Sequence, residues 1–411
     1  MAVIRPFKAL RPGKNVAHLV ASVPYDVVNR EEAALYAQDF PNSYLRITRA
    51  EIELNNNVNP YSDEVYQKAK ENLERIKREA PLIVEDMPRF YVYKLVMGNQ
   101  QQTGIAATFS VEDYDNNVIL KHEKTRKEKE DDRTRHIITT EAQTGPVFLT
   151  YRGVDAVNNL VEKTMKETDP VYDFTAPDGI KHTIWIMPGE YNNQLENEIG
   201  SVKSLYIADG HHRAASASRA CKVKKDANPA HTGQEEYNYF LAVLFPAEQL
   251  SIMPYNRVVL DMNGHTKEEF FNGIREYFTV ESSGSPVPPE RRSFAMYFEG
   301  AWYLLRPNDR VQNSENVSDN LDVSILQNYL LRPVLNIDDP RTNKRIDFIG
   351  GIRGTNELEK LVDSGKAAVA FSMYPLSVEE LMNISDAGEI MPPKSTWFEP
   401  KLRDGLLVHL I

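Results

Sequence analysis

Two adjacent histidines, an aspartate and an arginine lie within five consecutive positions of the stretch "SLYIADGHHRAASASRAC" (204–221). The apolar run before Asp209 has the composition of a strand, and the small residues after Arg213 have that of a helix. A glycine between a strand and a helix lets the backbone turn tightly, and the helix start offers free N–H donors and a positive dipole end. With the side chains of His211, His212 and Arg213 as further donors, the turn favours an anion, most naturally phosphate.

Two other interpretations of this turn stay open. In a metal site, adjacent histidines would have to converge, but neighbours in sequence point in different directions, unlike the i, i+4 pair of a zinc-binding helix. In a purely structural turn, Asp209 would cap the helix and the histidines would bond buried carbonyls. Because polar groups are costly to gather at one turn, their number favours a functional site.

The stretch "ADGHHRAASA" resembles the signature loop of the ParB/sulfiredoxin-like fold, in the variant carried by free-serine kinases. The wider chain is identified as a member of a bacterial family known only as a numbered domain of unknown function (ten-fifteen), which belongs to the same superfamily. That resemblance spans nearly the whole chain. The supporting motifs are "PYDVVNREEA", "NPYSDE", "KHEKT", "DDRTRHI", "GPVFLTY", "LDVSILQNYLL" and "PPKSTWFEPKLRDGLL".

The resemblance implies a site that binds nucleotide phosphates through Gly210, His211, His212 and Arg213. It places Asp209 at the reacting hydroxyl or on a Mg²⁺ ion that accompanies ATP or ADP. Free-serine kinases also use a catalytic glutamate from the N-terminal part of the fold, and the nearest candidates in this chain are Glu31 and Glu32, after "PYDVV". Asp26 competes for the same role, with Tyr25 beside it as a candidate substrate contact. Sulfiredoxin chemistry needs a reactive cysteine beside the phosphate-binding loop. Cys221 lies eight positions beyond Arg213, inside the expected helix, so this chemistry is disfavoured.

The motif "HEKT" adds a second group of candidates. Glu123 is a candidate general base or metal ligand, with His122 beside it, and Lys124 is a candidate counter-charge for phosphate. Arg133 and His136 lie three apart on one helical face and are candidates for the same pocket. The competing interpretation of "HEKT" is a solvated strand end or helix start, because the block that follows contains several i, i+4 charge pairs.

A third group lies near the C-terminus in "PPKSTWFEPKL". Lysines and hydroxyls in proximity suit a phosphate or carboxylate group, although a rigid proline-flanked loop explains the segment equally well. The candidates are Lys394, Ser395, Thr396 and Lys401.

Composition limits the classes of function. The 411-residue chain has a formal net charge of −11, which disfavours non-specific binding to nucleic acid. It has one cysteine, no signal-peptide core and no apolar run of membrane-spanning length, so we expect a cytoplasmic protein without a membrane partner. The oligomeric state stays undetermined.

Hydrophobic periodicity predicts an α+β (mixed α/β) fold. Helices are expected over 61–80, 154–167, 266–278, 322–335, 355–364 and 377–387, and a strand is expected before the "PYD" turn. Three segments are expected: a ParB/sulfiredoxin-like catalytic core (1–255), a small α+β subdomain (256–320) and an α/β segment that packs back on the core (321–411).

The leading functional hypothesis is a phosphotransferase that acts on a small hydroxylated metabolite, foremost free L-serine, in either direction between phosphoserine and a nucleotide. The alternatives are a ParB-like nucleotide-dependent regulator that binds DNA or a protein partner, and a phosphoserine phosphatase-type hydrolase.

Overall fold

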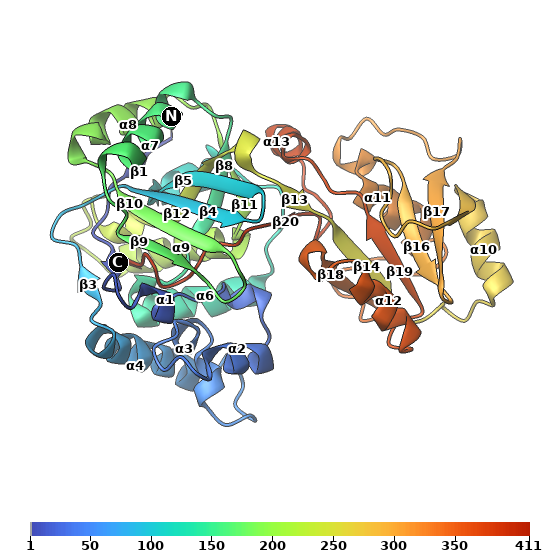
Figure 1. The fold of residues 1–411 in the computed structure, drawn as a ribbon, viewed down its shortest axis with the longest axis horizontal. Helices are drawn as coiled ribbons and strands as arrows, with labels where there is room; N and C mark the ends of the chain where they lie inside the picture. The colour runs from blue at the N-terminus through green and yellow to red at the C-terminus, as the bar shows by residue number, and fades with distance from the viewer. Residues whose placement is uncertain (1) are drawn as a thin grey trace. The chain divides into compact units, whose positions relative to one another are not determined.

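The structure is a computed structural model that describes residues 2–411, and the chain divides into two compact units (Figure 1). The bounds are Met1–Lys121, Thr125–Leu250 and Pro400–Ile411 for unit 1, and His122–Lys124 and Ser251–Glu399 for unit 2. Each unit is described by itself. Helices and several sheets are both present, so the predicted mixed α/β class is confirmed.

Unit 1 is built on a nine-stranded mixed sheet. In spatial order the strands are β6 (Ile119–Leu120), β11 (Leu205–Asp209), β8 (Val147–Tyr151), β12 (Tyr239–Pro246), β5 (Gln100–Ser110), β4 (Tyr91–Met97), β10 (Lys181–Ile186) and β9 (Tyr172–Thr175), with β1 (Ile4–Arg5) beside β5. β12 runs parallel to β8 and antiparallel to β5. Every residue of β8 and β12 is buried, as their continuous apolar sequences require, so these strands form the centre of the unit.

Helices cover this sheet and extend the unit beyond it (Figure 1). They are α1 (Ala17–Val20), α2 (Arg30–Ala37), α3 (Leu45–Thr48), α4 (Asp63–Glu79), α5 (Val111–Asp115), α6 (Lys127–Thr140), α7 (Asp155–Glu167), α8 (Asn192–Gly200) and α9 (His211–Asp226). α4 confirms the helix predicted over 61–80, with Val65, Ala69, Leu73 and Ile76 buried on one face. α6 packs on α9, and the two are joined by ion pairs from Arg219 to Glu130 (3.3 Å) and Asp131.

Unit 2 contains a six-stranded antiparallel sheet with its own apolar core. In spatial order the strands are β15 (Phe278–Ser283), β17 (Ala301–Pro307), β16 (Phe294–Phe298), β19 (Val369–Met373), β14 (Tyr255–Val259) and β18 (Ile346–Gly350). Its helices are α10 (Lys267–Arg275), α11 (Asp322–Leu326), α12 (Asn356–Asp363) and α13 (Val378–Asp386). β13 (Ile252–Met253) pairs with β20 (Trp397–Phe398). The β16–β17 hairpin turns at Glu299 and Gly300, which both have positive φ, as a two-residue primed turn requires.

The last twelve residues return to unit 1. Ser22 and Asp404 exchange backbone hydrogen bonds of 3.1 and 3.0 Å, and Leu10 and Val408 do the same at 2.9 and 3.0 Å. The final strand β21 (His409–Leu410) pairs with β7 (Ala142–Gln143), while β2 (Leu10–Arg11) pairs with β3 (Ile83–Val84). The return places Lys401 and Asp404 in the interior of unit 1.

The structure divides the chain at other points from the expected ones. The sheet of unit 2 takes β15, β16 and β17 from the segment 256–320 and β18 and β19 from the segment 321–411. Strand pairing over long sequence separations therefore joins these two segments into one unit. Unit 2 also takes residues 122–124 and 251–255 from the first segment, and unit 1 takes the last twelve residues of the chain. Such pairing leaves no local signal in the sequence.

Two local expectations also differ from the structure. In the apolar stretch "VASV" (20–23) before "PYD", Val20 ends the short helix α1 (Ala17–Val20) and Ser22 makes only an isolated antiparallel bridge to Asp404, so the expected strand is reduced to one bridge. The helix expected over 322–335 continues beyond α11 as a π-helix, Gln327–Leu331. A π-helix widens the turn by one residue, which a 3.6-residue pattern does not reveal.

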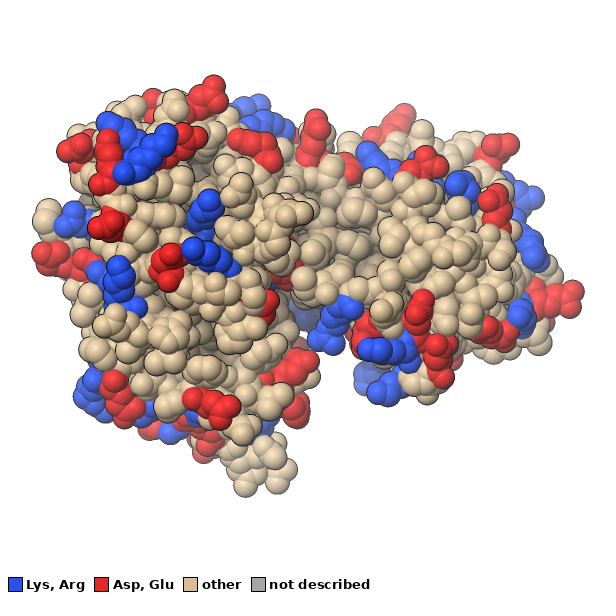
Figure 2. All heavy atoms as spheres, in the orientation of Figure 1, with Lys and Arg blue, Asp and Glu red and all other residues tan. Residues whose placement is uncertain are grey.

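Acidic and basic side chains are interspersed over the surface drawn in Figure 2, and no single-sign field dominates that face. Among residues 2–411, no helix has the length and apolarity needed to cross a bilayer.

The turn after Asp404 provides a test of the packing of the returning segment. Gly405 has φ +85°, and a Cβ atom there would lie 2.6 Å from Cγ of Tyr44, whose ring is fully buried. We expect Gly405→Ala to lower the free energy of unfolding by about 2–4 kcal/mol, through left-handed backbone strain plus overpacking. Urea unfolding measures this change. Gly98→Ala is the matched control, because Gly98 also has positive φ (+57°) but open space around it; equal losses in the two variants would contradict the steric part of the argument.

Candidate functional site

The predicted strand–glycine–helix turn is present in unit 1. β11 ends at Asp209, Gly210 adopts φ +93°, and α9 begins at His211. Only glycine takes this conformation without strain, and a Cβ at Gly210 would also lie 3.0 Å from Nε of Arg213. The backbone therefore turns so that the first N–H groups of α9 and the side chain of Arg213 lie near the end of β11.

Asp209 does not cap α9 in the usual way. Its Oδ1 accepts the N–H of Gly210 at 2.8 Å, and its Oδ2 accepts a hydrogen bond from Nζ of Lys401 at 2.9 Å. Nη2 of Arg213 is 3.6 Å from the same oxygen. Burial alone would raise the pKa of Asp209, but attraction to Lys401 and Arg213 outweighs it and holds the pKa well below its usual range. Asp209 is therefore an anion held between two cations.

Arg213 is the central cation of the site, and its side chain is only 8% exposed. Its Nη1 donates to the carbonyl of Pro146, and its Nη2 is 3.8 Å from Oδ2 of Asp26. Burial lowers the pKa of Arg213, but Asp26 and Asp209 raise it above its usual value, so the guanidinium stays charged. Nε of Arg213 has no partner among residues 2–411, which leaves one buried donor for a ligand or water.

Asp404 is the second incompletely paired group. It is 1% exposed, and neither carboxyl oxygen has a hydrogen-bond partner among the described residues. Burial raises its pKa to about 8; Arg213 lowers the pKa and Asp26 raises it further. The backbone of the loop before β8 approaches closely, because a Cβ on Gly145 would lie 2.7 Å from Oδ1 of Asp404. At neutral pH Asp404 is therefore mainly a neutral carboxylic acid.

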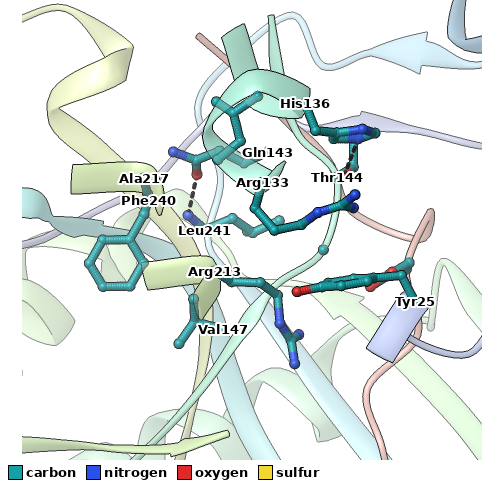
Figure 3. A pocket seen from close by; sticks show the side chains of 13 residues that line it. Tyr25, Arg133, His136, Gln143, Thr144, Val147, Arg213, Ala217, Phe240 and Leu241 are labelled. Carbon is teal, nitrogen blue, oxygen red and sulfur yellow. Dashed lines mark hydrogen bonds between the residues drawn. The ribbon is translucent and has the colours of Figure 1, made fainter. Parts of the chain in front are cut away.

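Arg213 and Asp404 both line a cavity of about 30 Å³ in unit 1, which is room for one or two water molecules. Figure 3 shows the ring of Tyr25 between the guanidinium groups of Arg133 and Arg213. The Arg133 guanidinium lies 4.3 Å from the centre of that ring and pairs with Asp132 at 2.9 Å. Burial and the nearby Arg133 lower the pKa of His136 to about 3, so its ring is neutral.

The structure brings together many of the residues expected from the sequence. Those gathered around Arg213 or its cavity in unit 1 are Tyr25, Asp26, Arg133, His136, Asp209, Gly210 and Lys401. His212 follows in the first turn of α9, where its Nε2 accepts the N–H of Arg126 at 3.1 Å.

The N-terminal glutamates occupy the start of α2. Glu32 forms a capping box with Asn29: the Asn29 side chain accepts the N–H of Glu32 at 2.8 Å, and Glu32 accepts the N–H of Asn29 at 2.9 Å. Glu31 is exposed on the first turn. The carboxylate that reaches Arg213 comes instead from Asp26, in the turn before α2.

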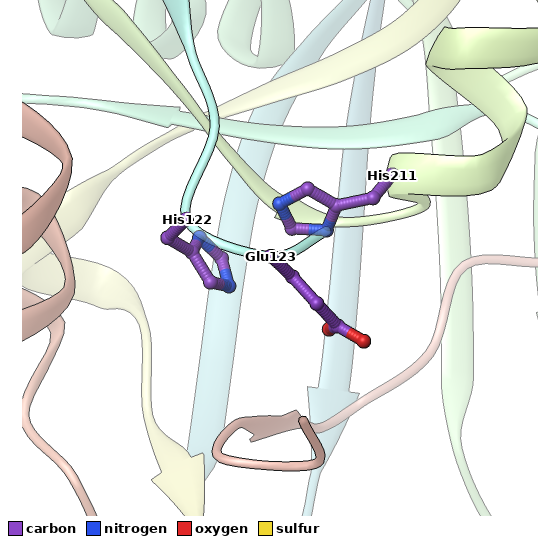
Figure 4. Close-up of side chains that lie close together, drawn as sticks. All are labelled: His122, Glu123 and His211. Atoms are coloured by element: carbon purple, nitrogen blue, oxygen red, sulfur yellow. The ribbon is translucent and has the colours of Figure 1, made fainter. Parts of the chain in front are cut away.

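The "HEKT" and "PPKST" candidates belong to unit 2. His122 accepts the N–H of Met391 at 2.8 Å through its carbonyl, and Lys124 is exposed. Figure 4 labels His122, Glu123 and His211, of which the first two belong to unit 2 and the third to unit 1.

The "PPKST" residues form a tight loop. Ser395 donates to the carbonyl of Pro392 at 2.6 Å, and the carbonyl of Lys394 accepts from Arg257 at 3.1 Å. Thr396 follows in the same loop of unit 2, whereas Lys401 belongs to unit 1.

Asp404 and Gly145 are the site residues that sequence reasoning missed. Asp404 stands in "KLRDGLLVHLI", where a charged residue begins an apolar run that is almost entirely buried. The signal in the sequence is a carboxylate that begins an apolar run, because an apolar run is expected to be buried. A carboxylate that is buried without a partner costs free energy, which suggests a functional role. Gly145 carries no such signal.

Asp209 belongs to no group of three metal-ligand side chains among residues 2–411. Its Oδ2 and that of Asp26 both lie within 4 Å of the same Arg213 nitrogen. Mg²⁺ binds oxygen donors and commonly takes one or two protein carboxylates, with phosphate oxygens and water completing its shell. Asp209 therefore offers an oxygen donor of the kind that Mg²⁺ takes, while in the structure its partners are the cations Lys401 and Arg213.

Several solved structures are distantly similar to this chain. A conserved hypothetical protein from Pyrococcus furiosus is 12% identical, with 75% of this chain and 95% of that chain covered and a TM-score of 0.37. A free serine kinase in complex with AMP is 12% identical (74% and 91% covered, TM-score 0.38), and SbnI with a C-terminal truncation from Staphylococcus aureus is 13% identical (74% and 87% covered, TM-score 0.38).

No curated protein matches the chain. The model of a family described as a protein of unknown function matches residues 4–324, which is most of the chain. The chain therefore belongs to the DUF1015 family.

Proposed function

We propose that the protein is a phosphotransferase that moves a phosphoryl group between a nucleotide, ATP or ADP with Mg²⁺, and a small hydroxylated metabolite, with free L-serine as the leading substrate. The same proposal includes a ParB/sulfiredoxin-like core for unit 1. The observation that carries it is the ionised Asp209, held between Lys401 and Arg213 at a strand–glycine–helix turn.

This arrangement suits phosphoryl transfer because such reactions depend on positioning and on neutralising charge. The start of α9 and the guanidinium of Arg213 supply donors for phosphate oxygens, and Lys401 supplies a second positive charge. Their fixed positions mean that little reorganisation is needed as negative charge moves to the leaving oxygen.

In the proposed step, the substrate hydroxyl oxygen forms a bond to the terminal phosphorus, and the bond from that phosphorus to the nucleotide oxygen breaks. The hydroxyl proton passes to a carboxylate. Asp26 is better supported for this role than Glu31 or Glu32, because it faces Arg213 while Glu32 is engaged in the capping box. Glu123 stays a candidate from the sequence alone.

A Mg²⁺ ion bound by Asp209 would neutralise charge on the phosphate oxygens, which leaves Asp26 to take the hydroxyl proton. Asp404 differs from both carboxylates, because it carries a proton at neutral pH and can donate a hydrogen bond to a substrate oxygen or to water. The site thus combines an ionised and a neutral carboxyl group within reach of one arginine.

Replacement of Asp209 tests the proposal directly. Asp209→Asn keeps the shape but removes the charge, and we expect it to lower kcat/KM by about 10²–10³-fold while nucleotide affinity is retained. Formation of phosphoserine from serine, nucleotide and Mg²⁺, followed by mass spectrometry, measures this. The matched control is Asp226→Asn at the exposed far end of α9.

Three outcomes of that assay would contradict parts of the proposal. Unchanged turnover in Asp209→Asn would remove Asp209 from the mechanism. A wild-type protein that forms no phosphoserine from ATP or ADP, and no ATP or ADP in the reverse direction, would exclude serine as the substrate. Free phosphate without an acceptor nucleotide would indicate phosphoester hydrolysis instead.

The raised pKa of Asp404 predicts a dependence of stability on pH. An unfolded aspartate titrates near pH 3.9, whereas the pKa of folded Asp404 is about 8. Between these values the folded state keeps a proton that the unfolded state has lost. The free energy of unfolding therefore falls as pH rises through this window, by at most about 1.4 kcal/mol per pH unit for one proton.

Asp404→Asn removes this titration, because the amide is neutral at every pH. We expect the stability of the variant relative to wild type to increase steadily from pH 4.5 to 7.5 in urea unfolding. Asp226→Asn again serves as the control and should follow the wild-type profile. Parallel profiles for Asp404→Asn and wild type would show that Asp404 is ionised in the folded protein at neutral pH.

A further inference from the structure

Unit 1 contains a second, larger cavity, of about 200 Å³, on the other side of the returning C-terminal segment from the Arg213 cavity. Arg403 lines this cavity, whereas its neighbour Asp404 lines the first. Most of the lining is apolar or aromatic, with Arg403 and Asp178 as its charged members. Drug-sized ligands occupy about 300–1,000 Å³, while an apolar cavity of about 150 Å³ suffices for benzene. The volume therefore suits one compact ring system.

A chain of buried groups fixes Arg403. The residue is 4% exposed, and its Nε donates to Nε2 of His182 at 3.1 Å. Burial, and then the charge of Arg403, lower the pKa of His182 well below its usual value, so the ring is neutral. Its one proton is therefore on Nδ1, which donates to the hydroxyl of Tyr93 at 2.9 Å. The guanidinium is thus held in one orientation.

Arg403 has a donor nitrogen that no described residue uses. Nη2 donates to Oδ2 of Asp178, but Nη1 has no acceptor among the described residues and is not one of the fully enclosed atoms. Asp178 is exposed in the β9–β10 turn and has further lone pairs. A donor and an acceptor therefore lie side by side at one end of the cavity.

Aromatic side chains form the walls. Phe174 and His18 lie with ring centres 6.4 Å apart, and Tyr36 and Phe40 line the cavity from α2 and the turn after it. Tyr36 is 53% exposed, so its ring can be reached from solvent. Rings of this kind stack on flat ligands.

We propose that this cavity is a small-molecule site for a purine ring, in which Arg403 donates to a ring acceptor and Asp178 accepts from an adjacent N–H of the same edge. A carboxylate ligand fits less well, because the charge of Arg403 is already balanced by Asp178. The inference does not require phosphoryl transfer, since the binding of a nucleoside without phosphate tests it alone.

The experiment titrates adenosine, guanosine and benzoate separately into the full-length protein, without Mg²⁺ or serine, by isothermal calorimetry or ligand-observed NMR. We expect at least one nucleoside to bind, and to bind more tightly than benzoate. Tyr36→Ala should weaken that binding about 10-fold, as the loss of one stacking wall does. Asp178→Asn, which keeps the shape and one acceptor, should weaken it by a similar factor.

Leu19→Ala is the matched control, because Leu19 is exposed beside His18 but does not line the cavity. Circular dichroism establishes that each variant is folded, and Tyr36 and Leu19 are both exposed enough to be replaced without loss of core. Failure of both nucleosides to bind, tighter binding of benzoate, or equal effects of Tyr36→Ala and Leu19→Ala would each overturn the proposal.

A competition titration shows whether the purine ring belongs to the nucleotide that donates phosphate or to a separate nucleoside. If the ring belongs to the nucleotide that serves as phosphate donor, adenosine and ADP exclude one another. If it belongs to a separate nucleoside, both bind at once. Either result supports the site, and neither depends on turnover of serine.

Discussion

Arg213 carries a positive charge in an almost closed interior, and the arrangement of unit 1 around α9 compensates that charge. An isolated buried ion costs several kcal/mol unless it is paired. The compensation comes from three parts of the chain: Asp26 before α2, Asp209 four residues before Arg213 at the end of β11, and the dipole of the Pro146 carbonyl before β8. Removing any of these would leave the others around an unbalanced cation, so the segments are tied to one another through a single side chain.

The returning C-terminal segment completes this balance. Lys401 gives Asp209 a second cation, and Asp404 adds a third carboxyl group near Arg213. Two carboxylates already face the arginine, so ionisation of a third in a buried place is unfavourable, and Asp404 keeps its proton. One cluster thus contains carboxyl groups of opposite protonation state, a difference created entirely by position. Such separation of pKa values is typical of sites that move protons.

The sequence predicts the local parts of this site well, and the reason is physical. A strand, a glycine and a helix in succession are specified by neighbouring residues, so the turn at Gly210 and the helix α4 were both predictable. Asp404 and Gly145 are far from Arg213 in the sequence, yet all three line the same cavity. The residues that flank Asp404 and Gly145 in the sequence do not predict this contact. For the same reason, the sequence did not predict that the segments 256–320 and 321–411 contribute strands to one sheet in unit 2. The glutamates after "PYDVV" have capping-box spacing, and that local role is visible for Glu32.

The bridge between Ser22 and Asp404 has a consequence for the register of the chain. Arg403 and Asp404 are neighbours, yet they line different cavities on opposite sides of the segment. A slip of one residue against Ser22 would turn each side chain to the other side. Arg403 would then face Arg213 and Arg133, and Asp404 would face Asp178, so like charges would meet on both sides at once. Charge repulsion in both cavities therefore disfavours a slipped alignment of this short, glycine-containing segment.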